Sequence, residues 1–246
     1  MAVLDAVLAL TFEEWSTQAP ERFPSSPKWT THEQWMSAHH HQQIRAAHEK
    51  TRQLQNQIAQ LTAEIETQET ELEKIHDEAA RSFHQRLLTE SDDALVDAVA
   101  QTLEVLGFAV VNLDKQLAPG EPKMGDLLVS DGSWTAVVEV KGYTKGAKAN
   151  DLLTVNRHRR VYEKKHGDVQ GVWYVVNSFR LTSPDSRQKM LNGFDDHIEE
   201  FGQGDGLTVD TRDLFKLLKK VESDDLDAAE ARKILVAQTG RLVFDE

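Results

Sequence analysis

Residues 125–142 read GDLLVSDGSWTAVVEVKG. Two apolar runs, residues 125–130 and 134–142, flank a short polar turn that contains Asp131 and Gly132, which is the pattern of a β-hairpin. Because side chains alternate between the two faces of a strand, every second residue of each run is expected to pack into a core. The stretch therefore predicts two antiparallel strands of a buried sheet.

Three charged residues, Asp126, Glu139 and Lys141, interrupt these apolar strands. Glu139 and Lys141 are two residues apart and point to the same face, and the turn brings Asp126 beside Glu139. Two carboxylates at close range repel each other unless a cation lies between them. Carboxylate oxygens suit Mg²⁺, and a metal bound there activates water and stabilises the charge on a phosphodiester under attack. The alternative is a solvated Glu-x-Lys pair on an exposed strand.

The elements on either side of the hairpin alternate in type. Periodicity, capping residues and glycine stops predict helices at 93–107, 150–167, 187–201, 211–221 and 224–238. Runs of β-branched and aromatic residues predict further strands at 108–113 and 171–179, and a short apolar segment at 241–244. The order of helix, three strands, helix and strand predicts an α/β domain over residues 89–246.

The segment before this domain has a seven-residue period without Pro or Gly. The a positions are Ile44, Thr51, Ile58, Ile65, Leu72 and Ala79, and the d positions are Ala47, Leu54, Leu61, Gln68 and Ile75. A two-position stripe is too narrow to bury one helix against a globular core, but it suits a seam between two helices. Residues 38–88 are therefore expected to form a coiled-coil helix that pairs two copies of the chain through Ile44–Ala79.

The direction of that pairing stays open. Ile at a with Leu at d, as at Ile58 and Leu61, favours parallel dimers, and the polar Gln68 at d is expected to help set the register. The alternatives are an antiparallel hairpin within one chain and a helix on the surface of the domain.

Residues 1–37 form a third, tryptophan-rich segment that contains Trp15, Trp29 and Trp35. A short helix followed by an extended part is expected there, because prolines stand at positions 20, 24 and 27.

The composition restricts the class of protein. The 246 residues are 39% hydrophobic and 28% charged, which is enough to bury a core. No apolar run approaches the ~18–20 residues of a membrane span, and the first residues lack the basic region of a signal peptide. With no cysteine, the chain has no disulfide and no thiolate metal site, which fits a cytoplasmic protein with no membrane partner.

The net charge of −13 counts against nucleic-acid binding unless basic residues cluster. They cluster directly after the charged triplet, where residues 141–166 contain eight Lys or Arg and two acids. The candidates for phosphate contact are Lys145, Lys148, Arg157, Arg159, Arg160 and Lys164. Such contacts position a duplex without reading its bases. The alternative is a solvated helix face.

The stretches GDLLV and VVEVKG resemble the signature of the PD-(D/E)XK nuclease superfamily. That superfamily includes many restriction endonucleases and the Mrr-like and archaeal Holliday-junction-resolvase-like enzymes. The resemblance covers roughly residues 91–180 and implies a restriction-endonuclease-like αβββαβ core with a mixed central sheet. The proline that names the motif is absent, and Gly125 stands before Asp126.

The resemblance also implies a set of site residues. Asp126, Glu139 and the backbone carbonyl of Val140 would be ligands of Mg²⁺ or Mn²⁺, and Lys141 would be the catalytic lysine. Relatives often add an acid on the first helix, a pair of residues one turn apart on the second helix, and an Asn and an Arg after the following strand. The auxiliary candidates here are Asp97, Glu104, His158, Tyr162, Asn177 and Arg187. For the last two, capping and loop hydrogen bonding is the alternative.

On this resemblance the chain is expected to be a Mg²⁺-dependent endonuclease that hydrolyses phosphodiester bonds in DNA. A bacterial defence or restriction role is implied, as a dimer or with a partner protein that supplies DNA binding or activation. A dimer suits cleavage of both strands, because each site can face one strand. Two alternatives remain: a non-catalytic adaptor that keeps the nuclease fold and assembles through its coiled coil, and a nuclease that acts on RNA or on branched or single-stranded DNA.

Overall fold

A computed structural model describes residues 2–23 and 32–244 of the chain. The chain divides into two compact units, Met1–Leu72 and Glu73–Glu246. Trp29 and two of the three prolines on which the expected extended segment rested, at 24 and 27, lie outside the described residues. No helix in the described part of the chain has the length and apolar character that crossing a membrane requires.

The first unit is helical. Helix α1 (Ala2–Gln18) is followed by a turn in which Phe23 packs on Trp15, with ring centroids 5.2 Å apart. A short 3₁₀ helix, η2 (Glu33–Trp35), precedes α2 (Ala38–Arg81). Helix α2 runs for 44 residues without a break, so the hairpin within one chain is wrong.

The second unit contains a six-stranded mixed sheet with the strand order β1-β2-β3-β4-β5-β6. The strands are β1 (Ala109–Asn112), β2 (Leu127–Asp131), β3 (Trp134–Gly142), β4 (Gly171–Asn177), β5 (Gly206–Asp210) and β6 (Gly240–Arg241). The first three pair antiparallel, and β3, β4, β5 and β6 pair parallel. This is the α/β class with a mixed central sheet that was expected.

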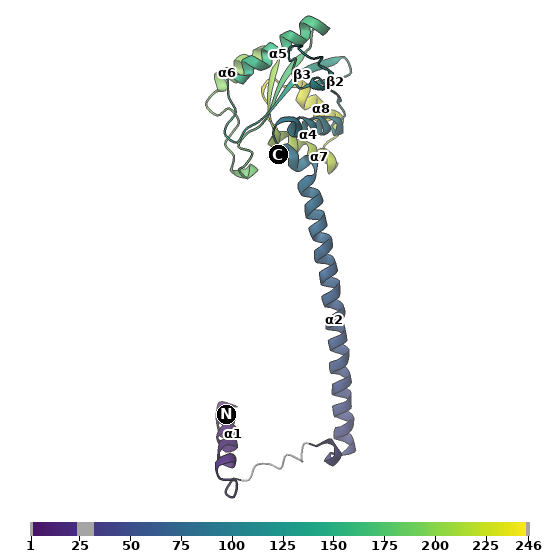
Figure 1. Ribbon diagram of the computed structural model, residues 1–246, viewed down its shortest axis with the longest axis vertical. Helices are drawn as coiled ribbons and strands as arrows, with labels where there is room; N and C mark the ends of the chain where they lie inside the picture. Colours follow the sequence, from purple (N-terminus) through teal and green to yellow (C-terminus); the bar gives the residue numbers. More distant parts are fainter. Residues whose placement is uncertain (1, 24–31, 245–246) are drawn as a thin grey trace. The chain divides into compact units, whose positions relative to one another are not determined.

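Helices cover both faces of the sheet (Figure 1). One face carries α3 (Phe83–Thr89), α4 (Asp92–Val105), α7 (Thr211–Glu222) and α8 (Ala228–Ala237), and the other carries α5 (Asp151–His166) and α6 (Asp195–Gln203). Successive residues of a strand point to opposite faces of the sheet. Trp173 therefore packs in the core under α3, α4, α7 and α8, and its neighbour Tyr174 packs in the core under α5 and α6. All seven residues of β4 are buried, as the parallel strands of a two-sided sheet require.

Several element boundaries differ from the predictions. The helix expected over 38–88 ends at Arg81, because Ser82 accepts a hydrogen bond from the amide of Gln85 and begins the separate helix α3. Strand β5 was not predicted at all. The helix expected over 187–201 begins only at Asp195. The apolar segment at 241–244 contributes only Arg241 to a strand, β6 (Gly240–Arg241).

The start of α4 lies directly against the end of β3. A Cβ atom on Gly142 would stand 2.7 Å from the Cα atom of Ser91, closer than real side chains allow. Glycine at this position therefore lets the N-terminus of α4 approach the end of the strand that carries Glu139 and Lys141.

Candidate active site

The hairpin places the two buried carboxylates side by side. In the β2–β3 pair Leu127 faces Val138, and the amide of Asp126 donates to the carbonyl of Val138 at 2.9 Å. The same register sets Asp126 opposite Glu139. Asp126 is 3% exposed and Glu139 is 1% exposed, so the solvated Glu-x-Lys alternative is wrong.

Each oxygen of Asp126 has its own partner. The backbone amide of Val140 donates to Oδ2 at 2.6 Å, and the ammonium of Lys123 donates to Oδ1 at 2.6 Å. Lys123 also contacts Oδ2 of Asp114 at 3.2 Å. Burial raises the pKa of Asp126, and the charge on Glu139 raises it further, against the lowering by Lys123 and the Val140 amide. Burial and the charge on Glu139 outweigh Lys123 and the amide, so the pKa of Asp126 lies above its usual value.

Glu139 is held by one residue from its own strand and one from α5. Nδ1 of His158 lies 2.7 Å from Oε2, and because an ionised carboxylate only accepts, this nitrogen carries the proton. The ammonium of Lys141 lies 2.6 Å from Oε1, yet Oε1 receives no hydrogen bond from the described residues. Burial opposes ionisation of Glu139, but His158 and Lys141 outweigh it, and the pKa of Glu139 lies below its usual value.

These donors fit a hard divalent cation. In each acid one oxygen is held by a donor other than lysine, the Val140 amide for Asp126 and the His158 ring for Glu139. The other oxygen of each acid contacts only a lysine ammonium, and that of Glu139, Oε1, is buried. Mg²⁺ is bound by one or two carboxylates and completes its shell with water and substrate oxygens. No three His, Asp or Glu groups of the described chain gather as a complete ligand set. Asp126 and Glu139 are therefore the two carboxylates that the described structure brings together for a cation.

The acids expected on the first helix do not reach the two carboxylates. Asp97 forms an ion pair with Lys115 at 3.3 Å, and Glu104 is exposed near the end of α4. Of the expected pair on α5, His158 contacts Glu139, whereas the ring of Tyr162 stacks on His166 with centroids 4.8 Å apart.

Asn177 and Arg187 serve the structure of the domain. Arg187 is 8% exposed and donates to the side-chain oxygen of Asn177 at 2.8 Å and to the carbonyl of Leu88 at 2.7 Å. Asn177 donates to the carbonyl of Glu90 at 2.9 Å. The two residues therefore fasten the link between α3 and α4 to the end of β4.

The six basic candidates divide into two groups. Lys145 and Lys148 are exposed on the loop after β3, and Arg157, Arg160 and Lys164 are exposed along one side of α5. Arg159 lies on another side of α5, where it donates to Glu163 and to the carbonyls of Val169 and Gly204. With these donors in use, Arg159 holds α5 in place and is removed from the candidates for phosphate contact.

A groove of about 550 Å³ runs beside the exposed basic residues of α5. Its walls are Arg157, Arg160, Val161, Lys164 and Lys165 on α5 and Glu121, Pro122 and Met124 on the loop before β2. Met124 is two residues from Asp126 and next to Lys123. Neither Asp126 nor Glu139 lines the groove, so it is a basic groove on α5 and not part of the acid pair.

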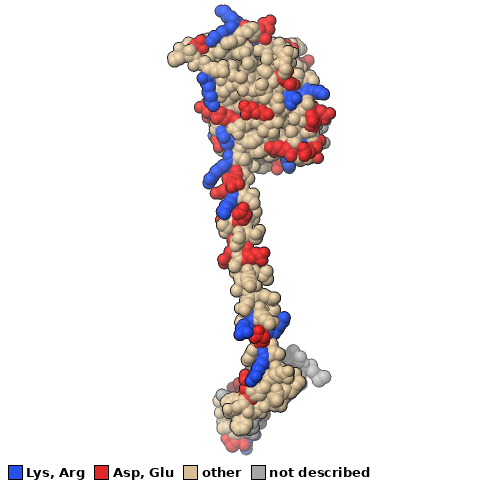
Figure 2. Space-filling view, turned by 90° about the vertical axis from the view of Figure 1, so that its right-hand side faces the viewer, with Lys and Arg blue, Asp and Glu red and all other residues tan. Residues whose placement is uncertain are grey.

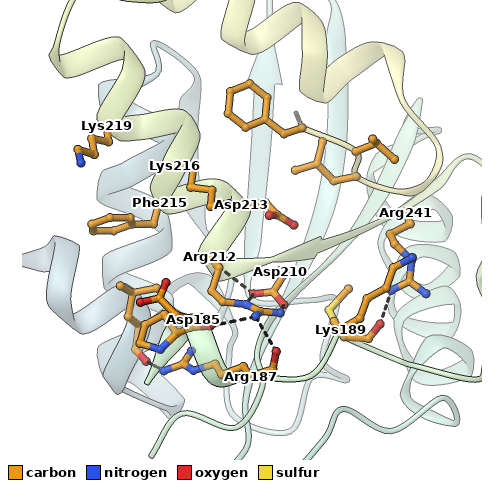
Figure 3. A pocket seen from close by; sticks show the side chains of 16 residues that line it. Asp185, Arg187, Lys189, Asp210, Arg212, Asp213, Phe215, Lys216, Lys219 and Arg241 are labelled. Carbon is orange, nitrogen blue, oxygen red and sulfur yellow. Dashed lines mark hydrogen bonds and ion pairs between the residues drawn. The ribbon is translucent and has the colours of Figure 1, made fainter. Parts of the chain in front are cut away.

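A larger cavity of about 880 Å³ lies apart from the acid pair, among α7, the loop after β4 and the C-terminal segment. Figure 3 shows Arg212 in this cavity, joined to Asp210. Its guanidinium also donates to the carbonyls of Pro184, Arg187 and Gln188, and that of Arg241 donates to Met190 and Asp195. These arginines are occupied by the protein itself, so the size of this cavity does not make it the reaction site.

Lys123 and Asp114 are the site residues that the sequence did not reveal. Burial lowers the pKa of Lys123, but Asp126 outweighs it and the pKa lies above its usual value. The signal was a lysine three residues before a buried acid, in the stretch PGEPKMGD. A lone lysine in a loop has no period or spacing that indicates such a contact.

A scan against protein-family models and a search of curated proteins found no match. Among solved structures, the chain is similar to the restriction endonuclease FokI, with a TM-score of 0.45 and 14% sequence identity. The similarity covers 64% of this chain and 30% of the FokI chain. The chain therefore matches less than a third of the length of FokI.

Proposed function

We propose that the α/β unit is a nuclease that hydrolyses phosphodiester bonds with Mg²⁺ or Mn²⁺, and that DNA is its substrate. The observation that carries this proposal is the pair of adjacent carboxylates, each less than 4% exposed, with Lys141 at 2.6 Å from Glu139. A buried like-charged pair is costly for a fold unless a cation uses it. The resemblance of the motif to PD-(D/E)XK nucleases supports the same chemistry.

The residues have distinct roles in this proposal. Asp126, Glu139 and the carbonyl of Val140 would hold the cation, which when bound polarises a phosphodiester and lowers the pKa of water. His158 fixes Oε2 of Glu139, so that the other oxygen keeps its direction. The ammonium of Lys141 stabilises the negative charge that develops on the phosphate as water attacks phosphorus and the P–O bond to the leaving oxygen breaks.

The exposed cations support a polyanionic substrate. Arg157, Arg160 and Lys164 line one groove on α5, the helix that also carries His158, and Lys145 and Lys148 lie on the loop that follows Lys141. The rest of the chain is acidic, with an overall charge of −13, so binding is expected to depend on this one region.

The proposal is tested by incubating the full chain with supercoiled plasmid, linear duplex, single-stranded DNA and RNA in Mg²⁺, Mn²⁺ or EDTA. Lys141→Met is expected to lower the cleavage rate by about 10²–10³-fold, because a donor that stabilises the transition state is lost. Lys233→Met, which removes an exposed lysine on α8, is the matched control and should cleave like the wild type. Equal behaviour of wild type, Lys141→Met and an EDTA sample would reject hydrolysis.

One feature favours a second candidate, the non-catalytic adaptor. Lys123 and Lys141 already neutralise Asp126 and Glu139, so the acid pair is compatible with the fold in the absence of any metal. The same assay separates the two functions, because an adaptor shows no cleavage that depends on metal.

The basic residues along α5 give an independent prediction. In a Lys141→Met background with Mg²⁺, the triple variant Arg157→Gln, Arg160→Gln, Lys164→Gln should weaken binding to a DNA duplex. The slope of log K against log salt concentration should fall by up to about 3, roughly 0.9 for each lost phosphate contact. Fluorescence anisotropy between 50 and 200 mM salt, roughly the range in which such contacts are measurable, gives this slope.

The control for that prediction replaces three exposed lysines elsewhere on the unit, at positions 189, 219 and 233, by Gln. This variant has the same change in net charge. If it lowers the slope as much as the α5 variant does, the groove is not the nucleic-acid interface.

We further propose that two copies of the chain pair through Ile44–Ala79. Apolar side chains at the a and d positions are strongly exposed on α2: Leu54 45%, Ile58 63%, Leu61 58%, Ile65 57%, Leu72 52% and Ile75 52%. A single helix with such a stripe gains stability when a second helix covers it.

A further inference from the structure

We infer that α2 pairs with α2 of a second copy in the antiparallel direction, with Ala38 opposite Arg81. The inference rests on the self-pairing proposed above and adds its direction and register. It is independent of whether the α/β unit hydrolyses DNA.

The two halves of α2 carry opposite charge. Residues 38–59 contain Arg45, Lys50 and Arg52 against the single acid Glu49. Residues 60–81 contain seven acids against Lys74 and Arg81. Figure 2 shows one side of α2, on which the charged side chains form two groups with a stretch between them that carries none. A parallel pair sets the two acidic halves against each other, whereas an antiparallel pair sets each acidic half against a basic one.

The residues that flank the seam show the same preference. The e and g positions lie on either side of the a and d residues, with Glu69 at e and Glu64 at g. In a parallel pair each g residue faces the e residue five positions later in the partner, so Glu64 faces Glu69 at two places in the dimer. In the antiparallel pair g faces g and e faces e, so Lys50 meets Glu71 and His48 meets Glu69, again twice. Like charges opposite each other destabilise a helix pair, and opposite charges set its direction.

One antiparallel register matches every layer of the seam between Ile44 and Ile75. When Ala38 faces Arg81, each a residue faces a d residue, and the whole 44-residue helix overlaps. Ile58 then faces Leu61, Leu54 faces Ile65, Ala47 faces Leu72 and Ile44 faces Ile75. The polar Thr51 faces the polar Gln68. Moving the register by one heptad in either direction sets Gln68 against an isoleucine, which buries a polar amide without a partner.

This arrangement separates the C-terminal ends of the two helices. Residue 81 of one copy lies about 65 Å along the axis from residue 81 of the other, at 1.5 Å per residue over 43 residues. In a parallel pair the two would be neighbours. In the antiparallel pair the two proposed sites would therefore act at separate positions on a duplex rather than on its two strands at one position.

Cysteine cross-linking tests the direction of pairing. Because the sequence has no cysteine, every disulfide that forms must join the introduced residues. The antiparallel register brings Leu54 of one copy to Ile65 of the other. A mixture of Leu54→Cys and Ile65→Cys chains should form a disulfide-linked dimer on mild oxidation, and each variant alone should form at least ten-fold less. Strong cross-linking of each variant alone would establish the parallel pair and overturn the inference. A monomer in light scattering would overturn the self-pairing as well.

Spin labels provide a measurement that leaves the seam intact. Asp77 and Ala63 are exposed and point away from the seam. Double electron–electron resonance on Asp77→Cys should give a distance of roughly 50 Å, because 35 residues separate the two labels along the axis. The control Ala63→Cys should give roughly 25 Å, with labels only seven residues apart along the axis. Short distances for both labels, or none for either, contradict the antiparallel pair.

Reversing the charges of Lys50 and Glu71 tests whether these two residues pair between the copies. Lys50→Glu should raise the dimer dissociation constant by about 3- to 30-fold, because two attractive pairs become repulsive. Adding Glu71→Lys in the same chain should restore it. In the parallel arrangement Lys50 faces Gln55, so no restoration by Glu71→Lys is expected there, and its absence counts against the register.

Discussion

Glu139→Gln is expected to abolish metal binding and DNA cleavage together. The substitution keeps the size of the side chain but removes the negative charge that lies between His158, Lys141 and the proposed cation. Loss of a carboxylate ligand is expected to weaken Mn²⁺ binding by at least about ten-fold. Loss of the cation removes several kcal/mol of transition-state stabilisation, which corresponds to at least about 10³-fold in rate. Electron paramagnetic resonance of Mn²⁺ measures binding without any need for turnover.

Lys141→Met provides the contrast. Its ammonium lies 2.6 Å from Oε1 of Glu139 and competes there with a metal, so its removal should leave Mn²⁺ affinity equal or higher while cleavage is lost. Glu230→Gln, an exposed acid on α8, should change neither quantity. If Glu139→Gln does not fold, Glu139→Asp, which keeps the charge on a shorter side chain, takes its place. Normal Mn²⁺ binding by a folded Glu139 variant would remove Glu139 from the ligand set.

The geometry of the acid pair could be predicted because strand periodicity and turn position fix it. A two-residue turn and a period of two determine which residues face each other, so Asp126 opposite Glu139 followed from the sequence. The burial of both acids followed from their apolar neighbours. The contact with Lys123 did not, since it comes from a loop whose path depends on the packed domain.

Arg159 shows that a cluster of basic residues in the sequence does not identify which of them are free to bind a phosphate. Its neighbours Arg157 and Arg160 are exposed, whereas Arg159 donates to Glu163 and to the carbonyls of Val169 and Gly204. Four adjacent positions of a helix point to all sides of it. A run of basic residues therefore contains both surface cations and structural ones, and only the tertiary contacts distinguish them.

Strand β5 was missed for a similar reason. Its five residues, GLTVD, are all buried, but they are few and stand between glycines and the helix α7. Their role depends on parallel pairing with β4, a contact between distant parts of the chain. Short buried strands carry little periodicity of their own.

Arg187→Ala is expected to lower the free energy of unfolding of the α/β unit by at least about 3 kcal/mol, because several buried acceptors lose their donor. Arg187 donates to the carbonyls of Leu88, Thr182 and Arg180 and to the side chain of Asn177. Alanine leaves these acceptors without their donor, and each buried unsatisfied group costs about 1–3 kcal/mol. Lys has a single charged nitrogen that cannot span them, so Arg187→Lys should also destabilise.

Urea unfolding followed by circular dichroism measures this loss, with Lys189→Ala as the control on the same loop. Lys189 is exposed and its removal should change stability by less than about 0.5 kcal/mol. A catalytic role for Arg187 predicts the opposite pattern, in which the unfolding free energy is unchanged and the cleavage rate falls. Because Arg187 joins the α3–α4 link to β4, and α4 in turn lies against the end of β3 at Gly142, its loss should also loosen the strand that carries Glu139. The Arg187→Ala variant should therefore cleave DNA at temperatures low enough for the unit to be folded and lose cleavage as the unit unfolds on warming. The Glu139→Gln variant should not cleave DNA at any temperature.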